Sequence, residues 1–531
     1  MRRWGSFAAA VLAVLVLVLA PTSARGTAPA VVDAGPSPKA QCGPGSRPET
    51  GLQGEVTAQD HSSGYADQPF TCNTQLLSHF GSSGGFKVER YTDAAGHDCA
   101  YFDSTLLFPL DVPGAIGAYV LDMSDPAHPV NTAMLVTPAM LTPHESLLVN
   151  AKRGLLAAVM GNPLAYPGIV DLYDISGDCR HPVLQSSTPT GILGHESGFA
   201  PDGNTFYAAS LATGNLTAID VSNPSLPVTL WTGPYSSHGL SLSDDGNRAY
   251  LAARTGTGPN GDKAGLIILD VSQVQARVAN PQPTVVSTLT WDNVSIPQNA
   301  MPISIGGHPY VLEIDEFAGG PFPSTAPSAP VGAGRIIDVA DETKPQVISN
   351  LRLEVHQPEH RAAVLGDPGA NSFVGGYAGH YCGVPQEIDP GIVACSMILS
   401  GLRVFDIRDP FHPKEIAYFN SAGLPETGDG TVDAFAMSRP SFVPERGEIW
   451  YADGNSGFYA VRLTNGVWPF TSTPAAPSAP PTAVVAVSAP SPTVARPAGS
   501  VLPVTGATVP LGMVVAIAAL ALLIRRASAQ T

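Results

Sequence analysis

Histidines recur at intervals through the middle of this chain, and imidazole is the side chain that most often binds transition metals in proteins. They occur in the pairs His144-Glu145, His195-Glu196, His238-Gly239 and His356-Gln357. If the chain stacks repeated segments around an axis, imidazoles at equivalent places in the repeats converge on that axis. Such a set can bind copper, zinc or iron, with Glu145 and Glu196 as further ligands or as partners that fix the ring tautomers.

The same histidines also admit a purely structural interpretation. A histidine just ahead of a strand can bond to neighbouring groups and simply lock a turn. The chain has no Gly-x-Ser-x-Gly elbow, no phosphate-binding glycine loop and no His-Glu-x-x-His helix that would point to another chemistry. Both interpretations of the histidines stay open from the sequence.

A short phrase that recurs along the chain predicts the elements that would position these residues. It reads aliphatic or aromatic residue, Asp, aliphatic residue, then Ser or a substitute, and its copies are Leu121–Ser124, Tyr173–Ser176, Ile219–Ser222, Leu269–Ser272, Ile337–Ala340 and Phe405–Arg408, with Tyr459–Leu463 as a degenerate last copy. The apolar residues around the Asp suit a buried strand, and the Pro-containing segment that follows most copies must be a turn. About seven such units predict a radial array of sheets.

A second recurring element supplies a hairpin ahead of the repeated strand. Asp202-Gly-Asn204 and Asp245-Gly-Asn247 each stand between two apolar runs, which is a strong signal for a tight turn. Each unit then holds four strands. The prediction is an all-β fold, a β-propeller of about seven four-stranded blades over residues 70–470.

The aliphatic-Asp-aliphatic phrases resemble the LVIVD-repeat family of bacterial proteins. The resemblance covers roughly residues 100–465 and implies a propeller-like fold and an extracellular location. It implies no particular activity, because one fold serves many functions.

Both ends of the chain carry targeting signals. Residues 1–24 are typical of a secretory signal peptide, with Arg2-Arg3, an apolar stretch and small residues before Ala24. We expect residues 25–69 to be a disordered arm and lead-in. Residues 471–501 are rich in Pro, Ala, Ser and Thr, which predicts an extended spacer.

The last segment, residues 502–531, resembles a sortase sorting signal. The pentapeptide Leu502, Pro503, Val504, Thr505 and Gly506 is followed by an apolar run and then by Arg525-Arg526. The resemblance implies that a sortase cuts after Thr505 and joins it to cell-wall peptidoglycan, after transient membrane insertion of the C-terminal helix. A plain C-terminal membrane anchor is the alternative.

Six cysteines in an exported chain predict disulfides. Cys382 and Cys395 are close in sequence and would staple one hairpin. Among Cys42, Cys72, Cys99 and Cys179 the sequence leaves the pairing open, and we favour 72 with 99 and 42 with 179.

Two hypotheses for function follow. The net charge of −17 argues against nucleic acid as a partner. The first hypothesis is a wall-anchored surface binding or adhesion module for a protein or glycan ligand, which the display signals favour. The alternative is a metal-dependent surface enzyme that uses the histidine cluster, with copper, zinc or iron as the cofactor.

Overall fold

The structure is a computed structural model that describes residues 35–104, 117–161, 168–191, 194–210, 213–253, 265–317, 330–370, 375–421 and 435–470. All of them belong to one compact unit, Met1–Pro474. The predicted signal peptide, spacer and sorting signal lie outside the described residues. Within the described ranges, no helix is both long enough and apolar enough to cross a membrane.

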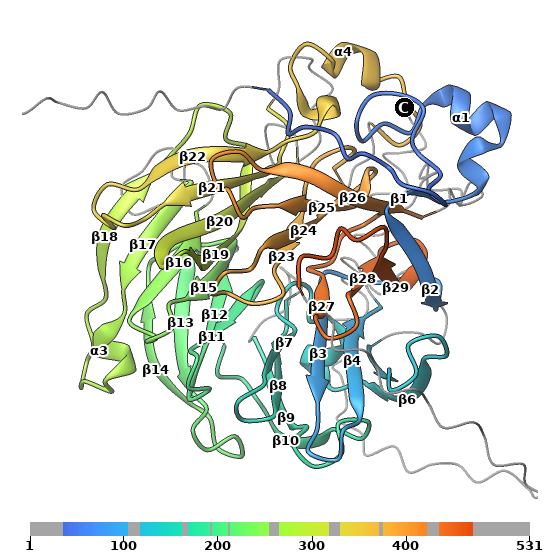
Figure 1. Ribbon diagram of the computed structural model, residues 1–531. Coiled ribbons are helices and arrows are strands. Elements are labelled where there is room, and N and C mark those ends of the chain that lie inside the picture. Colours follow the sequence, from blue (N-terminus) through green and yellow to red (C-terminus); the bar gives the residue numbers. More distant parts are fainter. Residues whose placement is uncertain are drawn as a thin grey trace, which may run out of the picture. The chain divides into compact units, whose positions relative to one another are not determined.

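Seven antiparallel sheets follow one another around a common centre (Figure 1). Blade 1 holds β3 (Val88–Thr92), β4 (Asp98–Asp103), β5 (Ala118–Asp122) and β6 (Val130–Leu135). Blade 2 holds β7 (Leu148–Asn150), β8 (Leu155–Val159), β9 (Val170–Asp174) and β10 (Val183–Thr188). Blade 3 holds β11 (Ser197–Phe199), β12 (Thr205–Ser210), β13 (Asn215–Asp220) and β14 (Val228–Gly233).

The later blades repeat this order. Blade 4 holds β15 (Gly239–Leu242), β16 (Arg248–Ala252), β17 (Leu266–Asp270) and β18 (Thr284–Leu289). Blade 5 holds β19 (Ile296–Ile305), β20 (His308–Glu316), β21 (Gly334–Asp338) and β22 (Gln346–Leu351). Blade 6 holds β23 (Tyr381–Gly383), β24 (Ile392–Met397), β25 (Gly401–Asp406) and β26 (Lys414–Asn420), and β1 (Phe70–Cys72) adds a fifth strand.

Blade 7 closes the ring with strands from both ends of the described chain. It holds β27 (Ser441–Val443), β28 (Glu448–Asp453) and β29 (Gly457–Leu463), and its outer strand is β2 (Thr74–Phe80). β27 in turn contacts β3 of blade 1. The predicted propeller of seven four-stranded blades is therefore confirmed, with one extra strand on blade 6.

The repeated Asp has a local structural cause. In blades 1 to 6 it is the last residue of the third strand, where its Oδ1 accepts a hydrogen bond from the backbone N–H two residues later. This bond is 2.8 to 3.1 Å long at Asp122, Asp174, Asp220, Asp270, Asp338 and Asp406. The Asp therefore ends the strand and starts the turn that the prolines continue.

The core lies between the blades. The blade 3 strand residues Tyr207 and Leu216 pack with Leu251 and Ile267 of blade 4, and all four are buried. Short helices occur only as additions among the described residues: α1 (Ala58–Ser63), η1 (Tyr65–Asp67), α2 (Pro138–Leu141), α3 (Ser272–Gln275), η2 (Glu354–His356) and α4 (Arg361–Val364).

The expectation of a disordered arm over residues 25–69 is wrong for residues 35–69. This segment contains α1 and η1, and it packs along blade 6. Arg403 of β25 contacts Glu49 at 2.8 Å and Glu415 at 3.1 Å. The segment is ordered because it adds ion pairs and an apolar contact to a finished sheet, which its polar composition did not reveal.

The disulfides confirm one predicted pair and correct the other two. Cys382 and Cys395 are bonded across β23 and β24 as predicted. The remaining bonds are Cys42–Cys72 and Cys99–Cys179, so the pairing of 72 with 99 and of 42 with 179 is wrong. Cys72 lies in β1, which pairs with blade 6, whereas Cys99 lies in blade 1.

Candidate functional site

Four histidines stand at equivalent places, just ahead of the innermost strands. His144 precedes β7, His195 precedes β11, His238 precedes β15 and His380 precedes β23. Each of the first two histidines is followed by a glutamate. These glutamates, Glu145 and Glu196, pair as a parallel β-bridge, which holds neighbouring blades in register at this level. The blade repeat therefore delivers one imidazole from each of four blades to the same end of the propeller axis.

The four imidazoles meet around the carboxylate of Glu145. Its oxygens lie 3.6 Å from Nε2 of His144, 3.2 Å from Nε2 of His195, and 3.5 Å from Nε2 of both His238 and His380. Ligand atoms of His144, Glu145 and His195 all lie within 4.8 Å of one another. The donor atoms of these three residues are thus gathered in a space of metal-site dimensions.

A second carboxylate enters the cluster from blade 5. Glu316, the last residue of β20, lies 3.5 Å from Nε2 of His238 and 3.2 Å from Nε2 of His380. Blade 5 has no histidine at the equivalent place, and Glu316 is the side chain that blade 5 adds to the cluster. We did not anticipate Glu316, because it sits on a second strand and outside the histidine pattern.

In two of the rings, Nδ1 forms a hydrogen bond with a backbone carbonyl. Nδ1 of His238 lies 3.1 Å from the carbonyl of Pro297, and Nδ1 of His380 lies 2.6 Å from that of Met437. A carbonyl only accepts, so each Nδ1 carries a proton. In the neutral ring of His238, Nε2 then points its lone pair at a carboxylate, an arrangement that a cation between them would relieve.

His195 is buried, and among the described residues neither of its ring nitrogens has a hydrogen-bond partner of good geometry. Glu145 Oε2 is in the same condition, although it lies 3.2 Å from His195 Nε2. Buried polar atoms are rarely left without partners. These two residues therefore mark the centre of the cluster as a place for a ligand.

The electrostatics act in opposite directions on two of these rings. Burial, together with the neighbouring imidazoles, holds the pKa of His238 well below its usual range. Burial also acts to lower the pKa of His380, but its contacts with Glu145 and Glu316 raise it to about 9. Against burial, the three nearby imidazoles hold the pKa of Glu145 well below its ordinary value.

Two residues predicted as ligands are occupied elsewhere. His356 lies in η2, where Nδ1 accepts from the N–H of Leu353 at 3.0 Å and Nε2 lies 2.7 Å from the carbonyl of Tyr377. Glu196 is held by Lys87 and Asn299. Neither nitrogen of His356 is free to bind a metal, and His380 takes the place that we assigned to His356.

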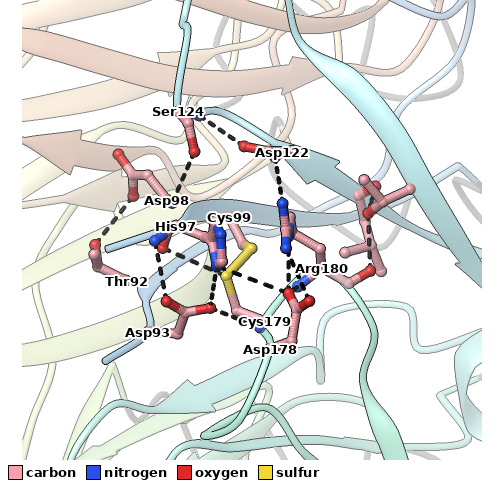
Figure 2. The surroundings of a disulfide bond; sticks show 12 residues. Thr92, Asp93, His97, Asp98, Cys99, Asp122, Ser124, Asp178, Cys179 and Arg180 are labelled. Atoms are coloured by element: carbon pink, nitrogen blue, oxygen red, sulfur yellow. Dashed lines mark hydrogen bonds and ion pairs between the residues drawn. A yellow bond between two sulfur atoms is a disulfide. The ribbon is translucent and has the colours of Figure 1, made fainter. Parts of the chain in front are cut away.

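A second group of possible ligands lies beside the Cys99–Cys179 disulfide (Figure 2). Nδ1 of His97 lies 2.8 Å from Asp93 and 3.9 Å from Asp178. Asp93 also accepts from the N–H of Cys179 at 3.1 Å, and Asp178 is paired with Arg180 at 2.8 Å. These carboxylates are satisfied by protein groups, so the cluster fastens the disulfide loop of blade 2 to the hairpin of blade 1.

Comparison with known proteins supports the repeat. Residues 203–231 match the LVIVD repeat. No curated protein sequence matches the chain. The described propeller and this match together define a seven-bladed β-propeller with an LVIVD repeat, and its three disulfides are consistent with an extracellular protein.

Solved structures with similar coordinates include three bacterial proteins. A functionally unknown protein from Desulfotomaculum acetoxidans has a TM-score of 0.42 and 11% identity, covering 67% of this chain and 89% of that one. A putative 6-phosphogluconolactonase from Bacteroides uniformis has a TM-score of 0.41 and 12% identity. The match covers 65% of this chain and 91% of that one. The hydrazine synthase of Kuenenia stuttgartiensis has a TM-score of 0.44 and 12% identity. The match covers 72% of this chain and 97% of that one. Similarities of this size carry no argument about function.

Proposed function

We propose that this protein is an exported propeller with a transition-metal centre on its axis. Nε2 of His144, His195, His238 and His380 would supply the imidazole ligands, and Glu145 and Glu316 would act as further ligands or as partners of the rings. Copper, zinc and iron all accept such a nitrogen-rich set. The metal-dependent surface enzyme thereby becomes the leading hypothesis.

The observation that supports this proposal best is the crowding of Nε2 atoms against carboxylates. Two rings donate a hydrogen bond from Nδ1 to a backbone carbonyl, and their Nε2 atoms lie 3.2 to 3.5 Å from Glu145 or Glu316. Buried carboxylates are costly unless they are paired with positive charge. A divalent cation at the meeting point would pair with both carboxylates at once.

Secretion and cell-wall anchoring belong to the proposal as the sequence predicts them. Residues 1–24 would direct export, and residues 502–506 would be the sorting signal for sortase and peptidoglycan. Binding of a protein or glycan ligand at the cell surface stays a prediction. We rank it second, because the convergent ligand set is the more specific feature of the described residues.

The test is metal content, measured by elemental mass spectrometry on protein purified without a histidine tag. The double variant His195→Ala/His238→Ala should lose most of the bound copper, zinc or iron. The matched control is His128→Ala/His412→Ala, which removes two imidazoles whose side chains are 82% and 83% exposed. Equal metal content in the two double variants would contradict the proposal.

A further inference from the structure

A pocket of about 370 Å³ lies between the outer strands of blades 3 and 4. One side of it is the end of β14 with the residues that follow, 230–235, and the other is the segment that leads into β18, 280–283. Its volume is within the range of about 300–1,000 Å³ that small-molecule sites occupy. The axial histidines precede the innermost strands, so this pocket is at the opposite edge of the sheets.

The lining of the pocket is uncharged. Residues 230–235 and 280–283 include no acidic residue, no basic residue and no histidine, although the whole chain has a net charge of −17. A charged ligand would lose hydration here without gaining a counter-charge. The lining therefore favours a neutral ligand.

Two aromatic rings form the apolar part of the lining. The rings of Trp231 and Tyr235 have centroids 5.8 Å apart, and both pack against the core between blades 3 and 4. A Cβ at position 233 would lie 2.0 Å from Cζ2 of Trp231, so only a glycine lets the indole lie over Gly233. The face of an aromatic ring carries partial negative charge, which attracts the polarised C–H groups of a ligand.

Two carboxamides form the polar part of the lining. The side chains of Asn280 and Gln282 are exposed, and Gln282 Nε2 donates to the carbonyl of Asn280 at 3.2 Å. A carboxamide offers two N–H donors and one oxygen acceptor. This combination matches hydroxyl groups, because each hydroxyl both donates and accepts.

The segment that carries these carboxamides is held in place. Pro281 and Pro283 flank Gln282 and fix the backbone on both sides of it. The backbone N–H of Gln282 donates to Oε1 of Gln273 at 2.9 Å, and the Tyr235 hydroxyl donates to the carbonyl of Pro283 at 3.0 Å. A site that is already ordered loses less entropy when a ligand binds.

We propose that this pocket binds a neutral glycan, with the C–H face of one sugar ring stacked on Trp231 and its hydroxyl groups bonded to Asn280 and Gln282. A proline-rich peptide also packs on aromatic rings, but its prolines have no N–H to give to the carboxamide oxygens. The glycan site is separate from the axial cluster, and it does not depend on whether the histidines hold a metal.

The experiment is isothermal titration calorimetry of the purified full chain with chitotetraose and with cellotetraose, two neutral oligosaccharides. A chelator is present throughout, so that the result is independent of the axial site. We expect binding of one or both, and no binding of the anionic tetragalacturonate. Trp231→Ala and the double variant Asn280→Ala/Gln282→Ala should each lower the affinity about tenfold or more, because each removes an anchor of the ligand.

Phe411→Ala is the control, because it removes an aromatic ring that is 50% exposed and lies in blade 6, and it should leave the affinity unchanged. The double variant changes only exposed side chains, so it decides the question even if Trp231→Ala does not fold. No binding of either neutral oligosaccharide at millimolar concentration, or unchanged affinity in the double variant, would overturn the proposal. Binding of an oligoproline peptide in place of both sugars would overturn it as well.

Discussion

At the residue scale, the buried histidines differ in what their second nitrogen contacts. Nδ1 of His380 is bound to a backbone carbonyl, and its Nε2 faces Glu145 and Glu316. Both nitrogens of His356 contact backbone groups. One arrangement leaves a donor atom for a metal, and the other uses the whole ring to hold a loop.

This difference predicts opposite phenotypes for two alanine substitutions. His380→Ala should abolish most metal binding. His356→Ala should leave metal binding intact and lower the free energy of unfolding by about 1–3 kcal/mol, because it leaves buried backbone groups without partners. Metal titration and urea unfolding of both variants give the result, and metal loss in the His356 variant alone would show that the ligand set is misassigned.

Asp103 provides a pH-dependent contribution to stability. Burial raises the pKa of this carboxyl to about 8, against the lowering effect of backbone N–H groups. An unfolded Asp titrates near pH 4, so the folded state binds the extra proton between about pH 4 and pH 8. This contribution to the free energy of unfolding therefore falls as the pH rises through that range.

The measurement is the pH dependence of urea unfolding for Asp103→Asn. The variant cannot ionise at this position, so its stability relative to wild type should rise with pH by at most about 1.4 kcal/mol per unit between pH 4 and pH 8. Asp125→Asn, at an exposed turn, is the control and should show no such trend. A flat difference for Asp103→Asn would contradict the raised pKa.

Sequence reasoning located three of the four converging histidines. It missed His380 because residues 352–380, with η2 and α4, separate β22 from β23. Spacing to the repeated Asp held the correct signal: His380 precedes Asp406 about as closely as His195 precedes Asp220, whereas His356 is nearly twice as distant. No such signal marks Glu316, since only the fold brings the end of β20 to the axis.

At the element scale, the repeat and its turn chemistry were predictable because they are local. The Asp that ends the third strand of blades 1 to 6 bonds to the backbone two residues later, and this needs no tertiary structure. The N-terminal segment was not predictable, since its order depends on contacts with blade 6 that are remote in sequence. The pairing of Cys42, Cys72, Cys99 and Cys179 failed for the same reason.

The contacts of this N-terminal segment predict two very different effects on stability. Arg403→Met removes a 1% exposed cation that pairs with Glu49 and Glu415, and it should cost about 3–5 kcal/mol because two buried carboxylates lose their partner. Lys39→Met breaks the exposed pair with Glu354 and should cost no more than about 1 kcal/mol. Urea unfolding compares them, and equal costs would mean that the Arg403 cluster does not fasten the segment.

At the scale of the whole propeller, closure of the ring and the axial cluster are linked. β2 joins β29 in blade 7, and β27 contacts β3, so the ring is complete only when both ends of the described chain have paired. The four histidines come from blades 2, 3, 4 and 6, and Glu316 comes from blade 5. Their convergence is therefore a property of the closed ring, and no single blade contains the site.

The most direct test of the axial metal centre is an anomalous difference map from crystals of the purified protein, recorded at the absorption edge of the metal found by elemental analysis. We predict one strong peak on the axis, about 2.0–2.1 Å from Nε2 of several of the ligands His144, His195, His238 and His380 if the metal is zinc. A well-ordered axis with no peak, or a peak only at exposed histidines such as His128, would contradict the account.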